Sequence, residues 1–159
     1  MAGNSGAAHP EFLKLVAFDA EDLSVISAHV QDAETQASNI AYVAASQRFV
    51  IMLARHDWPS LETSTPMRIQ SGVHFDHVTK VSSIGFDRAD TRLMRLLSVT
   101  FALKDAPSGI VTLTFADGAA IRLEAECLDV QMRDIGPRWP VMPQPGQGLA
   151  AKGETEFGN

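Results

Sequence analysis

The sequence predicts an α+β fold, built from a mainly antiparallel sheet of about seven to eight strands and one N-terminal helix. Residues 110–126 alternate between apolar and polar side chains on either side of Asp117-Gly118, a dipeptide typical of tight two-residue hairpins. Residues 19–30 carry the signals of a helix, and the chain offers no long crossover segments of the kind that a parallel sheet needs. We expect the sheet to curl, either as a partly closed barrel or as two layers.

The predicted hairpin at residues 110–126 has two chemically distinct faces. The first face is apolar and carries Val111, Leu113, Phe115, Ile121, Leu123 and Ala125. The second face is polar and carries Thr112, Thr114, Arg122, Glu124 and Glu126. Because successive side chains of a strand point to opposite faces, this pattern predicts a ribbon with one face in the core and one face in water.

The predicted helix begins after Asp19, whose short acidic side chain suits the N-cap position. Asp22 falls in the first turn, where a carboxylate complements the positive end of the helix dipole. Leu23, Ile26 and Val30 then recur at helical spacing, and the pattern fades over residues 31–34. We therefore expect a helix of about three turns with one buried face.

The remaining strands are predicted from runs of alternating or continuous apolar residues. These runs cover residues 36–43, 48–55, 67–75, 78–86, 97–103 and 128–134. The segment 49–54 is apolar without alternation, which predicts a strand covered on both faces. We expect a turn at residues 44–47, a short helical turn at residues 88–94, and a continuation of the second hairpin strand into 128–134 past a bulge near Cys127.

A length of 159 residues fits one domain, which we place at residues 12–139. Residues 1–11 are interpreted as a flexible lead-in and residues 140–159 as a disordered tail rich in Pro and Gly. A net charge of −6 argues against binding to nucleic acid, whose phosphates require a basic surface. Cys127 has no second cysteine with which to pair, and neither a signal peptide nor a membrane-spanning segment is recognisable. We expect a cytoplasmic protein that does not contact the membrane.

No motif in the chain identifies a reaction, so we expect no catalytic residues, no cofactor and no metal site. His74 and His77 would share a face on a helix and point to opposite faces in a strand, and at a strand end or turn either arrangement is open. Surface histidines flanking a turn are the better interpretation. Cys127 is interpreted as a small apolar residue on the inner face of a strand, because Glu126 and Asp129 nearby disfavour its thiolate.

Two sets of residues are candidates for binding. Arg122, Glu124 and Glu126 form a row on the polar strand face, which suits a cation or polar ligand or an acid/base pair; the alternative is a solvated face with cross-strand ion pairs. Arg138 and Trp139 are of the types that dominate binding hot spots. The alternative for Trp139 is that its ring covers an open end of the β core. For Trp58 this alternative is the favoured interpretation.

Five segments of the chain resemble a known bacterial family. They are Phe12-Leu-Lys-Leu-Val-Ala-Phe-Asp-Ala-Glu-Asp-Leu, residues 48–58, Val111-Thr-Leu-Thr-Phe-Ala-Asp-Gly, Ala120-Ile-Arg-Leu-Glu-Ala-Glu-Cys-Leu and Asp134-Ile-Gly-Pro-Arg-Trp139. The chain resembles domain of unknown function 2948 over residues 12–139, and the ending at Trp139 is the most distinctive piece. The resemblance implies a small cytoplasmic bacterial protein with no established activity, cofactor or catalytic residues.

The sequence favours a non-catalytic accessory module that binds a protein partner or forms a homodimer, with Arg138 and Trp139 at the contact. The alternative is a small enzyme or small-ligand binder whose pocket lies near Arg122, Glu124 and Glu126.

Overall fold

The computed structural model describes residues 12–57, 66–87 and 89–141. Trp58 and the predicted lead-in at 1–11 lie outside the described residues, as does the predicted tail from 142 onward. The described chain forms one 10-stranded sheet that is mostly antiparallel, together with a single α-helix, which confirms the predicted class. The sheet has more strands than the seven to eight that we expect from the sequence.

The helix α2 spans Ala20–Val30, and three short 3₁₀ turns cover Ala37–Asn39 (η1), Ala44–Ser46 (η2) and Ala116–Gly118 (η3). The strands are β1 Lys14–Ala17, β2 Glu34–Thr35, β3 Ile40–Val43, β4 Arg48–Asp57, β5 Met67–Phe75, β6 Val78–Ile84, β7 Met94–Leu103, β8 Gly109–Phe115, β9 Ala120–Ala125 and β10 Val130–Pro140.

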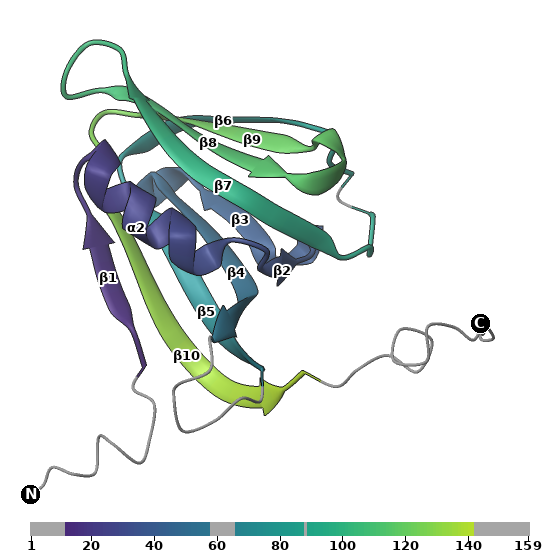
Figure 1. Cartoon of the computed structure of the whole chain (residues 1–159). Helices are drawn as coiled ribbons and strands as arrows, with labels where there is room; N and C mark the ends of the chain where they lie inside the picture. The colour runs from purple at the N-terminus through teal and green to yellow at the C-terminus, as the bar shows by residue number, and fades with distance from the viewer. Residues whose placement is uncertain (1–11, 58–65, 88, 142–159) are drawn as a thin grey trace, which may run out of the picture.

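The sheet consists of two halves that face each other (Figure 1). Strands β1-β10-β5-β4 form the first half and β7-β8-β9-β6 form the second, and the short strand β2 pairs with both β4 and β7. Strand β3 pairs with β4 only, and β6 pairs with β9 only. Each of these two strands therefore has one edge without a neighbouring strand. Helix α2 contacts β1 and β7, and thereby covers the open side of the core opposite those edges (Figure 1).

The helix follows the sequence prediction closely. Asp19 is the N-cap, and its Oδ1 accepts a hydrogen bond of 2.8 Å from the backbone N–H of Asp22. Leu23, Ile26 and Val30 are buried in the core, as their spacing predicts. The helix ends where Gln31 takes up extended backbone.

The predicted hairpin faces are confirmed, but its turn is longer than predicted. All the residues of its apolar face are buried, and the residues of its polar face point out of the core. Asp117 and Gly118 have φ angles of 72° and 85°, the left-handed conformation that their types favour. They lie in η3 rather than in a two-residue turn, since Phe115 N–H donates to the carbonyl of Ala119 at 2.9 Å.

The prediction that residues 49–54 are covered on both faces is wrong. Phe49, Ile51 and Leu53 are buried, whereas Val50 and Met52 between them are half-exposed on the outer face of β4. Helix α2 packs against the inner face only, so these outer apolar side chains remain in contact with solvent. Apolar side chains that are exposed together on one face often mark a binding surface.

Several other predictions from periodicity are wrong for local reasons. The strand predicted at 36–43 begins only at Ile40 because η1 precedes it, and residues 89–93 form a turn and irregular backbone rather than a helical turn. A bulge between Leu96 and Ser98 shifts the register of β7, which buries Leu96 and leaves Leu97 37% exposed.

The segment after Cys127 does not continue the hairpin strand. It forms β10 in the other half of the sheet, where it pairs with β1 and β5. Cys127 therefore lies in the connection between the two halves, half-buried, rather than on the inner face of a strand. Pro140, predicted to begin the tail, is the last residue of β10, and Val141 N–H donates to the carbonyl of Pro66.

Candidate functional site

The distinctive segment from Asp134 to Trp139 begins with a buried ion pair. The Asp134 side chain is fully buried, and its carboxylate accepts hydrogen bonds from Arg55 Nε at 2.8 Å and Arg55 Nη2 at 2.6 Å. Ser71 Oγ at 2.6 Å and the Leu13 N–H at 2.7 Å also donate to Asp134. One carboxylate on β10 thus contacts β4, β5 and the residue that precedes β1, which gives it a structural role.

The ionisation of Asp134 is determined by this network. Burial raises its pKa, but the hydrogen bonds from Arg55, Ser71 and the Leu13 N–H outweigh burial and hold the pKa below its usual value. The carboxylate therefore stays charged inside the protein.

Stability should consequently depend on acid pH through Asp134. In the unfolded chain an aspartate has a pKa of about 3.9, and in the fold this pKa is lower. The stabilising contribution is therefore complete above about pH 4 and is lost as pH falls through the folded pKa. Denaturant unfolding of the wild type and of Asp134→Asn, measured from neutral to acid pH, should give stability curves that converge below about pH 4. A constant difference between the curves would contradict this role.

The two predicted hot-spot residues at the end of β10 have different environments. Arg138 Nε donates to Asp57 Oδ2 at 2.6 Å, and its guanidinium lies 4.8 Å from the ring centroid of Phe12. Trp139 lies opposite Arg68 on β5 and is 36% exposed. Arg138 therefore serves an internal contact, and Trp139 is the more available of the two for a partner.

The candidate histidines His74 and His77 each lie near an aspartate. His74 on β5 has Nδ1 3.5 Å from Asp76 Oδ2, and His77 after the strand has Nε2 3.4 Å from Asp129 Oδ2. Burial, followed by the charges of Asp129 and Glu126, raises the pKa of the Cys127 thiol. Within the described ranges, no group of three or more His, Cys, Asp or Glu side chains is arranged to hold a metal ion.

The structure brings Arg122, Glu124 and Glu126 together around one hollow on the outer face of the second half. The hollow has a volume of about 420 Å³, and Lys104 and Thr79 also line it. The polar row is therefore concave rather than flat, although its side chains are exposed to water.

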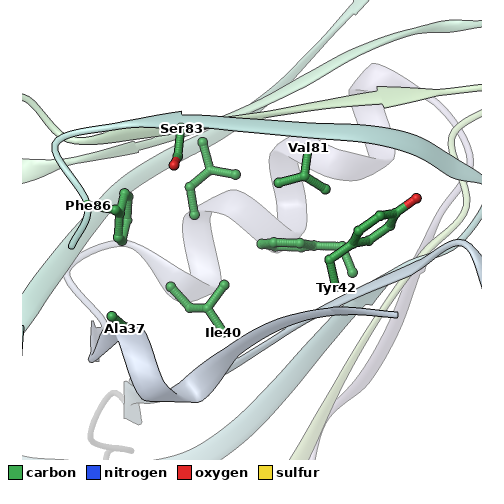
Figure 2. Close-up of a pocket in the computed structure, with 8 residues that line it drawn as sticks. Ala37, Ile40, Tyr42, Val81, Ser83 and Phe86 are labelled. Carbon is green, nitrogen blue, oxygen red and sulfur yellow. The ribbon is translucent and has the colours of Figure 1, made fainter. Parts of the chain in front are cut away.

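A different pocket lies in the seam between the free edges of β3 and β6. This seam pocket has a volume of about 130 Å³ and is lined almost entirely by apolar side chains, which are Ala37, Ile40, Tyr42, Phe49, Val81, Ser83, Phe86 and Ile121. Figure 2 shows Phe86 and Tyr42 at its two ends, with Ile40 on the β3 side and Val81 on the β6 side.

The two strand edges are joined at only one end of the seam. There Tyr42 Oη donates to the carbonyl of Val78 at 2.6 Å, and the Val78 N–H donates to the carbonyl of Gln47 at 2.9 Å. Beyond these contacts β3 and β6 do not pair with each other, and the pocket opens between them. A barrel that closed here would have no such opening.

Reasoning from the sequence did not identify the seam pocket. Its only local signal is the apolar spacing of Ile40 with Tyr42 and the weak alternation of Val81 with Ser83, which are equally typical of ordinary half-buried strands. The pocket arises from the strand order, which periodicity does not determine.

Comparisons with known proteins place the chain in a family without assigning it an activity. None of the curated proteins or solved structures compared with it matches. No helix among the described residues is long and apolar enough to cross a membrane. A family model described as "Protein of unknown function (DUF2948)" matches residues 13–147, and the chain therefore belongs to the DUF2948 family.

Proposed function

We propose that this protein is a non-catalytic accessory module that binds an extended segment of a partner protein at the seam between β3 and β6. The observation that carries the proposal is an apolar pocket enclosed between two strand edges that lack a neighbour. Such edges bind peptides by adding a strand, in which the main chain provides affinity and a side-chain pocket provides specificity.

The free edge of β6 is the better candidate for strand addition. It offers a longer edge than β3, with seven residues at Val78–Ile84 against four at Ile40–Val43. Unpaired N–H and C=O groups on such an edge readily accept another chain, and Lys80 in this strand is of the type that prevents uncontrolled pairing between copies. Which partner segment pairs with the β6 edge thus depends on the side chain that enters the seam pocket.

The size of the pocket limits the group that it accepts. Its volume of about 130 Å³ is close to that of an engineered cavity of about 150 Å³ that binds benzene. One ring or one branched aliphatic side chain therefore fills it, and the apolar walls favour Phe, Leu or Ile over a charged side chain. We infer that the partner segment has one apolar anchor side chain. The residues on either side of the anchor need only adopt an extended backbone.

A cytoplasmic partner agrees with the composition of the chain. The chain has a single cysteine and a net charge of −6, which favour a reducing compartment and disfavour nucleic acid as the partner. A second copy of the chain is the competing occupant, because two β6 edges can also pair with each other.

Substitution of Ser83 by Trp should block the seam pocket. Ser83 is exposed on β6 and lines the pocket, so a large ring is accommodated at its mouth without entering the core. Peptides selected from a random displayed library against the full chain should carry one Phe, Leu or Ile anchor. Their affinity for Ser83→Trp should fall by about tenfold or more, since burial of an apolar side chain provides about 1.5–3 kcal/mol.

The matched control is Thr100→Trp, which places the same ring on the outer face of β7 away from the seam. It should leave peptide affinity unchanged. N-methylation of alternate peptide amides should also abolish binding, because it removes the donors that pair with the strand edge. Peptides that bind Ser83→Trp as tightly as the wild type would refute the proposal, and a dimer that Ser83→Trp dissociates would identify a second copy as the occupant.

The hollow lined by Arg122, Glu124 and Glu126, called the Arg122 hollow below, supports a second candidate function, which is that of a small-ligand binder or small enzyme. The observation in its favour is the convergence of Arg122, Glu124 and Glu126 on a hollow of about 420 Å³. A polar ligand held there should raise the melting temperature of the wild type and not that of Glu124→Gln, whereas Ser83→Trp should respond as the wild type does.

A further inference from the structure

A third hollow lies on the outer face of the first half of the sheet and centres on Gly72. Gly72 on β5 lies between Arg133 on β10 and Met52 on β4, and these three residues line a space of about 260 Å³. This outer hollow is separate from the seam pocket, since Phe49 and its neighbour Val50 on β4 face opposite sides of the sheet.

The fold itself does not require glycine at position 72. Its φ angle lies outside the left-handed region, and an added Cβ would meet only the flexible ends of Met52 and Ile135, at 3.1 Å and 3.4 Å. A glycine inside a strand weakens it by about 0.5–1 kcal/mol relative to alanine. Such a glycine often marks a place where a ligand approaches the backbone closely.

Two arginines lie on the rim of the outer hollow although the chain is acidic overall. Arg48, His74 and Arg133 line it, in a chain whose net charge is −6. Asp76 is held by Arg48 Nε at 2.7 Å and lies 3.5 Å from His74 Nδ1, an atom that has no hydrogen-bond partner among the described residues.

Arg133 also lies opposite a residue of the same charge. It lies directly opposite Lys14 in the antiparallel pair of β1 and β10, and both side chains are exposed. Like charges in directly opposite positions destabilise such a pair. Within residues 12–57, 66–87 and 89–141 no acidic side chain forms an ion pair with Arg133 that would relieve this repulsion. A bound anion would relieve it.

The walls of the outer hollow are apolar. Val50, Met52 and Ile135 line it, and Ile135 is 49% exposed. A volume of about 260 Å³ lies just below the range of about 300–1,000 Å³ that is typical of pockets for drug-sized ligands. We propose that the outer hollow binds a small organic carboxylate, whose apolar body packs against Val50, Met52 and Ile135 and whose carboxylate pairs with Arg133.

Phenylpropionate is a suitable probe, with its uncharged amide and with acetate as matched comparisons. Titration of each into the full chain is followed by amide NMR spectra. Phenylpropionate should bind saturably and shift the Gly72 and Arg133 signals, while phenylpropionamide and acetate should bind about tenfold more weakly or worse, because each lacks one half of the interaction.

Two substitutions test the assignment from opposite sides. Gly72→Ala narrows the hollow without backbone strain, because its methyl group displaces the flexible ends of Met52 and Ile135, and Arg133→Gln removes the charge. Each substitution should weaken phenylpropionate binding about tenfold or more. Thr100→Val and Ser83→Trp should bind it as the wild type does, which separates this site from the seam pocket. Absence of saturable binding, equal binding of the amide, or unchanged affinity in both substituted proteins would overturn the proposal.

Discussion

Replacement of Asp134 by Asn is expected to lower the free energy of unfolding by about 3–5 kcal/mol, the usual cost of leaving a buried charge without its partner. The substitution preserves the shape of the side chain but removes the charge that balances Arg55, which is only 2% exposed. It also places an amide donor where Arg55, Ser71 and the Leu13 N–H all donate. Denaturant unfolding followed by circular dichroism measures the effect.

Asp76→Asn is the matched control for this experiment. Asp76 also pairs with an arginine, but Arg48 is 46% exposed, and such surface pairs contribute about 0–1 kcal/mol. The double variant Arg55→Met with Asp134→Leu should be more stable than Asp134→Asn, because neither charge remains buried. A loss in Asp134→Asn no greater than that in Asp76→Asn would show that the buried network does not stabilise the fold.

Phe115→Ala is expected to have a comparably large effect, with a loss of about 3–5 kcal/mol. Phe115 is 1% exposed at the end of β8, and its ring packs edge-to-face on that of Phe86 with centroids 5.2 Å apart. Removal of the ring leaves a cavity beneath one end of the seam pocket, because Phe86 lines that pocket. Thermal and denaturant unfolding both report the loss.

Leu103→Ala is the control for Phe115→Ala. Leu103 ends the neighbouring strand β7 but is 63% exposed, so its truncation should change the free energy of unfolding by less than about 0.5 kcal/mol. If Phe115→Ala were as stable as Leu103→Ala, the assignment of Phe115 to the core would be wrong.

Local physical rules explain which parts of the fold could be predicted from the sequence. The helix begins after Asp19 because a side-chain cap is a contact between near neighbours, and the hairpin faces follow from strict alternation. The bulge at Leu97 and the uncovered outer face of Val50 and Met52 could not be predicted, because they depend on which strands pair and on where the single helix packs.

The same distinction holds for the candidate sites. The segment ending at Trp139 stands out in the sequence, but two of its charged residues make internal contacts, from Asp134 to Arg55 and from Arg138 to Asp57. The members of these pairs are 79 and 81 residues apart, respectively, a separation that no short motif reveals. The seam pocket likewise depends on the strand order, which leaves β3 and β6 each with one edge that has no neighbouring strand.

Hydrogen–deuterium exchange with and without a selected peptide tests the strand-addition proposal most directly. If the peptide pairs with the seam, backbone amides of β6 should exchange more slowly in its presence, and the Ser83→Trp protein should show no such protection. Thr100→Trp should behave as the wild type does. Protection confined to the Arg122 hollow, or to the outer face around Gly72, would contradict binding at the seam and would assign the partner surface elsewhere.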